Sequence, residues 1–557
     1  MSLSEVSELK RRLAVLFILA LLATCDKSSV TDTDTPRLPN PQGVSVLTQH
    51  NDNTRSGWND NETLLTTSNV NVQQFGKVFT VPVDDQVYAQ PLVVGKVAID
   101  GGDHNVVYAA TVNNTVYAFD GDDGTVFWQK NFTAPGMRPP RNTDMSGACG
   151  GGYRDFSGNI GIVGTPVIDA SRRTMYFVAR STTGSTFVQH LHAVDIASGN
   201  EVSGSPVVIS ASYAGTGDGS ANGMIAFDAR RQNQRQGLTL LNGIVYVTWS
   251  SHCDWGPYHG WILGYDAGTL QQSVVYNATP DGYAAGMWES GMGMAADVDG
   301  NLYVVTGNGT VGTSGDPTAL RNRGESALKL SRSGPTLQVE SYFTPGNYEF
   351  LDLYDLDYGS MGALLIPNSD YYFTGAKDGN LYLLNKNAMG GYTASSSGAR
   401  QSVPLGPSAN LHCQAAYYKG SAKEFVYVWS ENAPLYAIPF DRSSNMLDAG
   451  GAIRFSGSGP MGQSGAVLSV SSNGSQNGSG ILWAWYAFTG DAEHDVSPGM
   501  LRAFDAADVT KELWNNRQND SRDGAGAYAK FSSPTIANGH VYVATFSNQV
   551  VVYGLSP

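Results

Sequence analysis

The chain has 557 residues, a formal net charge of −15 and an isoelectric point near 5.0. Only 15% of the residues are charged, whereas Gly (65), Tyr (28) and Trp (10) are abundant, which favours many short strands with tight turns over long helices. No stripe of Lys and Arg is present, and this excludes nucleic acid as a partner because a phosphate backbone requires clustered cations.

The first 25 residues are typical of an export signal. The positive segment Lys10-Arg11-Arg12 precedes the apolar run LAVLFILALLA, which is too short to cross a bilayer. The run ends at Leu22-Ala23-Thr24-Cys25, which resembles a bacterial lipobox, although Thr24 stands where Gly, Ala or Ser is usual. We therefore expect a signal peptide over 1–25, lipidation of Cys25, and a flexible polar tether over 26–45.

This N-terminus predicts an exported protein, either a periplasmic or cell-surface lipoprotein or a simply secreted one. An uncleaved anchor is the third alternative. Beyond a lipid anchor at Cys25, nothing in the sequence is apolar for long enough to reach across a membrane. We expect a monomer.

A repeat of about sixty residues organises the rest of the chain, 46–557. Each unit has a short strand, a strand rich in Tyr and Val, and a strand ending in a small–aromatic–Asp pattern, as in PLVV, NVVYAATVN and TVYAFDGDDG. Gly-Asn, Asp-Gly and Asn-Gly separate the strands as hairpin turns. Eight copies align on Asp120, Asp195, Asp266, Ser331, Asn385, Pro439, Asp505 and Gly554. Units of four short antiparallel strands predict an all-β, eight-bladed propeller in a single domain.

The two ends of the repeat region predict how the ring closes. The eighth copy ends after QVVVYGL without an outer strand, while GKVFTVPV (Gly76–Val83) is a lone strand before the first unit. Joining the two would remove exposed strand edges. The alternative is a seven-bladed ring, in which a short unit near residue 385 or 439 is an insertion.

The first unit carries the motif A-x-D-x-x-x-G-x-x-x-W, over Ala118 to Trp128. Asp120 can cap the turn, Gly124 can adopt a positive φ, and Trp128 can pack against the next blade. The motif resembles the tryptophan-docking motif of quinoprotein dehydrogenases. From about residue 80 to 557 the chain is similar to the pyrroloquinoline-quinone (PQQ)-like propellers, above all to secreted bacterial members of unestablished activity.

This resemblance implies two functions. The family includes quinone-dependent alcohol and sugar dehydrogenases, and also non-catalytic lipoproteins that scaffold outer-membrane assembly. The dehydrogenases have adjacent cysteines in a disulfide against the quinone, and those with attached haem have CxxCH; this chain has neither. We therefore expect a binding or scaffold propeller that takes a small molecule, a glycan or an envelope protein at its rim. The alternative is a dehydrogenase dependent on PQQ and Ca²⁺.

The loops that enter each inner strand, and the turns between second and third strands, place a polar rim at one end of the channel. For the enzyme hypothesis we expect Asp254 or Asp357 as the base that takes the alcohol proton. Glu289 and Asn308 would supply oxygen ligands to Ca²⁺. The candidates for binding the cofactor are Gln90, Arg235, Trp288 and Lys530. The alternative for each carboxylate is that it holds the backbone of its turn.

The stretch SHCDWGPYHG (251–260) is dense in polar rings. His252 and His259 could bind a transition metal together with Asp254, or the stretch could be an ordered hydrogen-bonded loop. Cys253 in this stretch could also form a disulfide. A Cys149–Cys253 bridge is more plausible than a Cys253–Cys413 bridge, which would have to cross the channel.

Overall fold

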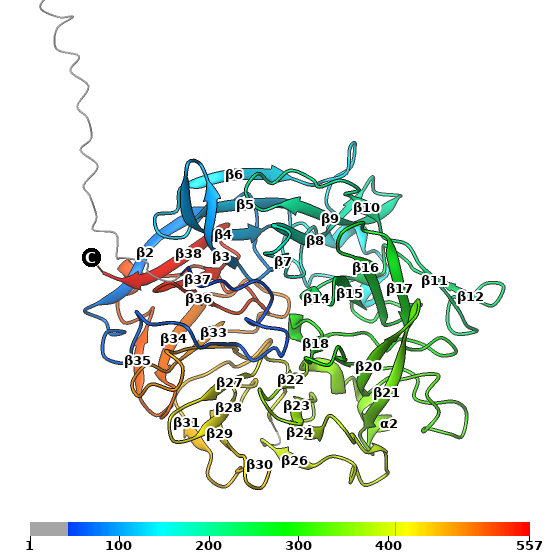
Figure 1. The fold of residues 1–557 in the computed structure, drawn as a ribbon. Coiled ribbons are helices and arrows are strands. Elements are labelled where there is room, and N and C mark those ends of the chain that lie inside the picture. The colour runs from blue at the N-terminus through cyan, green and yellow to red at the C-terminus, as the bar shows by residue number, and fades with distance from the viewer. Residues whose placement is uncertain (1–42, 407, 557) are drawn as a thin grey trace, which may run out of the picture. The chain divides into compact units, whose positions relative to one another are not determined.

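Short strands rich in Val and Tyr form eight small antiparallel sheets, which follow one another around a common centre (Figure 1). The computed structural model describes residues 43–406 and 408–556. The predicted signal peptide, the lipidation site at Cys25 and the tether up to residue 42 lie outside these residues.

Blades 1 to 4 each contain four consecutive strands, ordered from the channel outward. Blade 1 has β3 (Leu92–Ile99), β4 (Gly102–Ala110), β5 (Thr115–Asp120) and β6 (Val126–Asn131); blade 2 has β7 (Val167–Asp169), β8 (Thr174–Thr182), β9 (Phe187–Asp195) and β10 (Val207–Val208). Blade 3 has β14 (Thr239–Leu241), β15 (Ile244–Ser251), β16 (Trp261–Asp266) and β17 (Gln272–Asn277), with β13 (Gln232–Asn233) beside β15. Blade 4 has β18 (Ala295–Ala296), β19 (Leu302–Val305), β20 (Ala327–Ser333) and β21 (Thr336–Thr344).

Blades 5 to 8 complete the ring. Blade 5 has β22 (Leu364–Leu365), β23 (Tyr371–Gly375), β24 (Asn380–Asn385) and β26 (Gln401–Pro404), while β25 (Gly391–Tyr392) extends blade 4. Blade 6 has β27 (Ala416–Lys419), β28 (Glu424–Val428), β29 (Leu435–Asp441), β30 (Met446–Leu447) and β31 (Ile453–Phe455). Blade 7 has β32 (Val467–Ser471), β33 (Ile481–Ala487), β34 (Gly499–Asp505) and β35 (Glu512–Asn515). Blade 8 has β36 (Thr535–Ala537), β37 (His540–Ala544) and β38 (Gln549–Leu555).

The outer strand of blade 8 comes from the other end of the chain. Strand β2 (Phe75–Pro82) pairs antiparallel with β38, so that Phe75 lies opposite Leu555. The prediction of eight blades closed by an N-terminal strand is confirmed, and the seven-bladed alternative is wrong: the units near residues 385 and 439 are blades of their own.

Aromatic side chains connect each blade to the next. The Trp128 indole donates a hydrogen bond to the carbonyl of Ile196 in blade 2 (3.1 Å), as the motif predicts, and Tyr108 donates to the same carbonyl (3.0 Å). The equivalent tyrosine in blade 8, Tyr542, donates to Gly121 of blade 1 (3.1 Å), so the same contact also joins the two ends of the ring. These bonds satisfy buried polar atoms while the rings fill the space between sheets.

Residues 44–62, which we call the N-terminal plug, run across the centre of the ring (dark blue in Figure 1). The plug forms hydrogen bonds to the inner strand of every blade. Taken in chain order from Val46 to Asn59, its partners in blades 1 to 8 are Val93, Ile168, Leu240, Ala296, Leu365, Tyr417, Val470 and Ile536. The plug includes β1 (Trp58–Asn59), which pairs parallel with β32.

Arg55 anchors the plug from a fully buried position. Its guanidinium donates to the carbonyls of Gln49 (2.7 Å) and Met294 (3.1 Å) and to the hydroxyl of Thr239 (2.6 Å). A buried cation is tolerated only where its donors are paired, and these carbonyl and hydroxyl oxygens supply that pairing. The plug therefore forms a floor across the channel.

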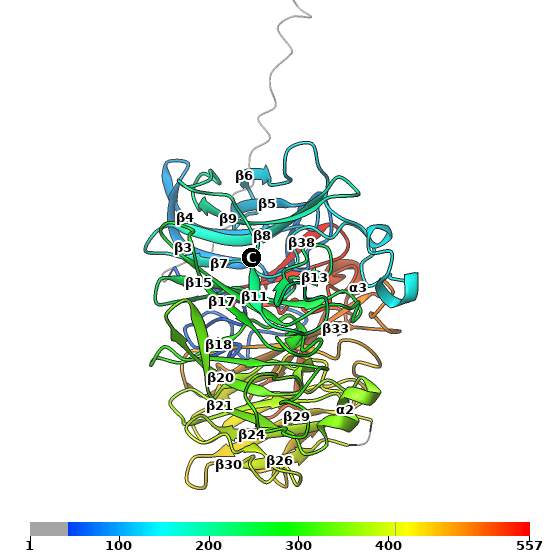
Figure 2. The ribbon, with the colours of Figure 1, turned by 90° about the vertical axis from the view of Figure 1, so that its right-hand side faces the viewer.

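Helical segments and one hairpin lie in the connections between the blade strands. They are the hairpin β11 (Ser212–Ala214) and β12 (Met224–Ala226), the helices α2 (Tyr348–Tyr354) and α3 (Asp520–Asp523), and the 3₁₀ turns η1 (Asn142–Asp144), η2 (Ala148–Gly151), η3 (Glu289–Gly291) and η4 (Tyr358–Ser360). Figure 2 shows α2 and the cyan insertion that follows β6 on the same face of the ring. Within the described residues, no helix is long and apolar enough to cross a bilayer.

Candidate functional site at the channel mouth

Loops from seven blades surround a polar cavity of about 350 Å³ at the end of the channel opposite the floor. Its walls consist of charged side chains, a disulfide and a tryptophan. The lining residues are Cys149, Asp155, Arg235, Cys253, Asp254, Trp288, Asp355, Leu356, Asp357, Ser360, Lys377, Asn410, His412, Glu431, Gln463, Asp491, Glu493 and His494. A second, more apolar recess shares Asp155, Arg235, Trp288, Gln463 and Glu493 with it and adds Lys530 and Phe531. We call the two together the mouth cavity.

One wall of the mouth cavity is the disulfide between Cys149 and Cys253, which joins residues 104 positions apart. Cys149 lies in the insertion between blades 1 and 2, and Cys253 lies in the turn between β15 and β16. The predicted pairing is confirmed. Cys413 is buried and free.

Lys377 connects two carboxylates on the blade 5 side. Its ammonium nitrogen lies 2.7 Å from Asp357 Oδ2 and 3.2 Å from Asp355 Oδ1. Burial alone would lower the pKa of Lys377, but the two carboxylates outweigh it and raise this pKa above its usual value. Asp357 is buried and also accepts from the backbone N–H of Asn308 (2.8 Å). Lys377 and the Asn308 backbone therefore fix the position of the Asp357 side chain.

Asp254 projects from the SHCDWGPYHG turn and accepts a hydrogen bond from the Tyr258 hydroxyl. Desolvation by the surrounding loops, followed by repulsion from Asp357, raises the pKa of Asp254 to about 7. Because its side chain still faces solvent in the cavity, Asp254 can exchange a proton with a ligand near neutral pH.

Glu431 and His412 form a nearly buried pair on the blade 6 side, with His412 Nδ1 3.6 Å from Glu431 Oε1. Burial and the carboxylate of Asp491 raise the pKa of Glu431 to about 8, and burial lowers the pKa of His412 well below its usual value. At neutral pH this wall therefore offers a protonated carboxyl and a neutral imidazole.

Another part of the mouth cavity contains hydrogen-bond donors that have no acceptor. The Arg235 guanidinium stacks on Phe531 (4.4 Å to the ring centroid) and on Trp288 (5.2 Å). Its Nη2 and the indole nitrogen of Trp288 have no hydrogen-bond partner among the described residues. Burial lowers the pKa of Arg235 to about 10 and that of the nearby Lys530 to about 8. Buried donors of this kind gain free energy when a ligand supplies oxygen acceptors.

The structure brings together Asp254, Asp357, Arg235, Trp288 and Lys530 in the mouth cavity. It places Gln90 elsewhere. The side-chain oxygen of Gln90 accepts from the backbone N–H of His50 in the plug (2.9 Å), and its amide donates to Thr535 (2.9 Å). Gln90 is thus part of the floor.

The four candidate metal ligands do not converge. Glu289 is fully buried and accepts from Val305 N–H, and Asn308 donates to Asp355. His252 pairs with the Tyr153 hydroxyl, and His259 uses both ring nitrogens on Thr279 and Asp218. Across residues 43–406 and 408–556 no group of three or more His, Cys, Asp or Glu side chains is placed to hold a metal ion. A metal role for the four residues stays a prediction.

Sequence reasoning missed several lining residues, among them Asp155, Lys377, Asp491, Glu493 and His494. Lys377 lies in the turn between β23 and β24, and Asp491, Glu493 and His494 lie in the turn between β33 and β34. The repeat itself contains the signal, since every turn between second and third strands points to the same end of the channel. Asp155 lies in the long loop that enters β7, for which the repeat predicts a rim position but not which residues reach the cavity.

Residues 76–252, which form the outer strand of blade 8, blades 1 and 2, and part of blade 3, match the family model described as outer membrane protein assembly factor BamB. No curated protein matches the sequence. The fold is similar to that of quinohemoprotein alcohol dehydrogenase from Pseudomonas putida HK5 (12% identity, TM-score 0.54, covering 92% of this chain and 80% of that one). It is also similar to the enzyme from Comamonas testosteroni (14%, 0.51, 92% and 80%) and to a europium-containing methanol dehydrogenase (11%, 0.57, 93% and 99%).

The chain matches this family model over residues 76–252 and shares the propeller fold of these dehydrogenases. The donors of Arg235, Trp288 and Lys530 suit the acid groups of a quinone cofactor. The two expected Ca²⁺ ligands fit a shared Ca²⁺ site less well. Glu289 accepts from the backbone of β19, whereas Asn308 donates to Asp355. Likeness at these identities shows a shared fold and does not decide between binding and catalysis.

Proposed function

We propose that this chain is an exported, non-catalytic binding propeller that holds a small hydroxylated acid in the mouth cavity. The observation that carries the proposal is the pair of unpartnered donors, Arg235 Nη2 and Trp288 Nε1, stacked beside Lys530. A ligand carboxylate placed there would accept from both donors and lie next to a cation.

The facing wall suits the hydroxyl groups of the same ligand. Asp357 is an ordered carboxylate acceptor, and Asp254 accepts or donates according to its protonation. Glu431, with its raised pKa, can donate from a protonated carboxyl. A ligand with a carboxylate at one end and hydroxyl groups along its length is a sugar acid. The aromatic surface formed by Trp288 and Phe531 suits a sugar ring.

Calorimetry with galacturonate, gluconate and glucose tests this proposal. We expect saturable binding of a sugar acid, no comparable binding of glucose, and a 10- to 100-fold weaker affinity for Arg235→Met, the range for a lost charged hydrogen bond. Asp169→Asn, at the end of β7 and away from the mouth cavity, is the matched control and should bind like the parent. Equal affinity of the parent and Arg235→Met would contradict the proposal, as would no binding of any acid.

A second function, a quinone-dependent dehydrogenase, is favoured by one observation: the same donors suit the quinone's acid groups. In that case Asp254 would be the proton acceptor. Reconstitution with PQQ and Ca²⁺ separates the two functions. Quinone absorbance changes and alcohol oxidation would support the enzyme, whereas sugar-acid binding by the quinone-free protein without turnover would support the binding propeller.

Export is part of the proposal, and the Cys149–Cys253 disulfide supports it because such bonds persist in oxidising compartments. We propose a cell-envelope location, with a lipid on Cys25 as the membrane attachment and a monomeric propeller. Cell fractionation, together with the mass of the mature N-terminal peptide, checks both points: an unmodified Cys25 in a released protein would show simple secretion.

A further inference from the structure

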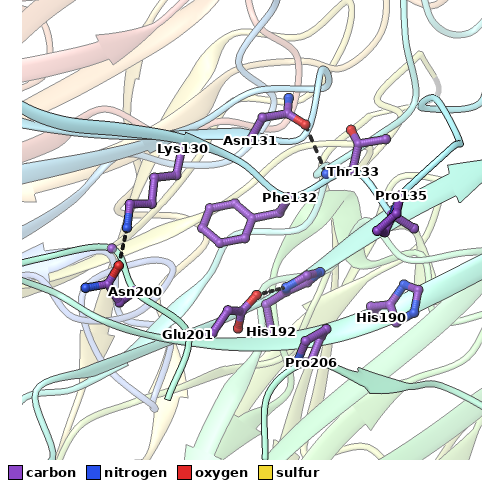
Figure 3. Close-up of a pocket in the computed structure, with 12 residues that line it drawn as sticks. Lys130, Asn131, Phe132, Thr133, Pro135, His190, His192, Asn200, Glu201 and Pro206 are labelled. Atoms are coloured by element: carbon purple, nitrogen blue, oxygen red, sulfur yellow. Dashed lines mark hydrogen bonds and ion pairs between the residues drawn. The ribbon is translucent and has the colours of Figure 1, made fainter. Parts of the chain in front are cut away.

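A second cavity, of about 470 Å³, opens on the flank of the ring between blades 1 and 2 (Figure 3). Its lining combines the end of β6 with the face of β9 and the loop that follows β9. We call it the flank cavity. It is lined by Lys130, Asn131, Phe132, Thr133, Ala134, Pro135, His190, His192, Gly199, Asn200, Glu201 and Pro206.

Two histidines enter the flank cavity from one strand. His190 and His192 occupy alternate positions of β9, so both side chains point to the same face of blade 2. Their ring centroids are 6.0 Å apart. The intervening Leu191 and the following Ala193 point the other way and pack in the core toward blade 3.

A carboxylate orients the deeper of the two rings. His192 Nδ1 lies 2.7 Å from Glu201 Oε1, and Figure 3 shows the ring between Glu201 and His190. The ring is further fixed by stacking on Phe177 (5.1 Å, 7° between planes) and by the edge of Phe132 (5.3 Å). Because a carboxylate accepts, Nδ1 of the neutral ring carries the proton and Nε2 carries a lone pair.

The lone pair on His192 Nε2 is a buried acceptor without a donor. His192 is only 4% exposed, and its Nε2 has no hydrogen-bond partner among the described residues. An unpaired buried acceptor costs about 1–3 kcal/mol, so such atoms are rare and need a reason. A histidine whose Nδ1–H is held by a carboxylate, with Nε2 free beside a second imidazole, is the arrangement that metal-binding histidines adopt.

We propose that the flank cavity binds one divalent transition-metal ion through His192 Nε2 and a ring nitrogen of His190. Imidazole nitrogens select borderline ions such as Cu²⁺, Ni²⁺ or Zn²⁺. No third His, Cys, Asp or Glu of the described chain completes the set, so water fills the remaining positions and the ion is exchangeable. Glu201 acts as a positioning residue, because it fixes the tautomer and the orientation of the His192 ring.

Cu²⁺ is the probe, followed by calorimetry and by electron paramagnetic resonance. We expect one ion per chain with hyperfine coupling to two imidazole nitrogens. His190→Gln should weaken binding more than tenfold and remove one nitrogen from the spectrum. Glu201→Gln should weaken it 10- to 100-fold, the usual effect of losing a carboxylate partner behind a histidine ligand.

His104 supplies the matched control. Its Nδ1 also lies against a carboxylate, Asp120 Oδ2 at 2.6 Å, but no ring contact joins it to a second histidine among the residues that the structure describes. His104→Gln should leave the Cu²⁺ affinity and the spectrum unchanged. His190 is only half-buried, so its variant should fold, and thermal unfolding checks this. Parent-like Cu²⁺ binding in folded His190→Gln, or no binding by the parent, would overturn the proposal. Arg235→Met should not affect Cu²⁺, which separates this test from the mouth cavity.

Discussion

The indole ring of Trp128 in blade 1 packs against Gly199 in blade 2, so closely that a Cβ atom on Gly199 would lie 2.7 Å from the ring. Gly199 also has a φ of +64°. The tryptophan of one blade therefore depends on a glycine in a turn of the next blade. In that turn of blade 2, Asp195 accepts hydrogen bonds from the N–H groups of Ala197 and Ser198 and so fixes the turn's shape.

Gly199→Ala should lower the free energy of unfolding by about 2–4 kcal/mol, because it adds a clash to a strained backbone. Gly184→Ala is the matched control: φ is +99° there, but no atom lies within 4 Å of the added Cβ. We expect the control to lose only about 1 kcal/mol. Denaturant unfolding measures both, and equal losses would show that the Trp128 contact contributes nothing.

Arg55→Met should lower the free energy of unfolding by at least about 3 kcal/mol. The variant leaves the carbonyl of Gln49 unpaired in the channel, where an unpaired group costs about 1–3 kcal/mol. It also removes the Arg55 hydrogen bonds to Thr239 and to the carbonyl of Met294, which keeps the Thr239 hydroxyl as its other donor. The comparison is Arg173→Met, whose half-exposed side chain lies 3.8 Å from Asp195 and should change stability by less than about 0.5 kcal/mol. If both variants unfold alike, the plug does not stabilise the ring.

Glu431 should make the protein less stable as pH rises. Its pKa is about 8 in the folded chain and near 4.5 when unfolded, so between these values the unfolded state releases a proton that the folded state keeps. The free energy of unfolding therefore falls as pH rises from about 4.5 to 8. Glu431→Gln should remove this slope and gain about 2–4 kcal/mol at pH 8 relative to the parent. Parallel stability–pH curves for the two proteins would refute the assignment.

Breaking the Cys149–Cys253 bridge should cost about 2–5 kcal/mol, since it closes a loop of roughly 100 residues in the unfolded chain. Chemical unfolding with and without a reductant measures this. The double variant Cys149→Ala, Cys253→Ala should match the reduced parent and show no response to reductant. A response that persists in the double variant would have to come from another cysteine.

The blades could be predicted from sequence because their information is local. Alternating Val and Tyr define each strand, and the Asp120–Gly124–Trp128 spacing defines a turn and its contact. The plug could not be predicted: its residues have no periodicity, and its order comes from partners such as Ile536, 477 positions away from Asn59.

The same limit applies to the mouth cavity. The repeat placed Asp254 and Asp357 at the correct end of the channel, because position in the blade determines the end. It could not show that His259 turns inward to Thr279 and Asp218, since the rotation of a turn side chain depends on packing with neighbouring loops. The ion pairs of Lys377 could not be predicted either, because Asp355 and Asp357 reach it from a different loop.

The contacts of the plug and of β2 with blade 8 also constrain the order in which the ring folds. Val44 donates to Asn538 and β2 pairs with β38, so the segments synthesised first find their partners only after the final blade exists. Contacts across nearly 500 residues close slowly, and until they close the first residues have no sheet to join. Removing residues 549–556 should therefore do more than shorten blade 8: it would leave β2 without its neighbour and expose the ring at its seam, so we expect such a chain to aggregate rather than to accumulate as a smaller propeller.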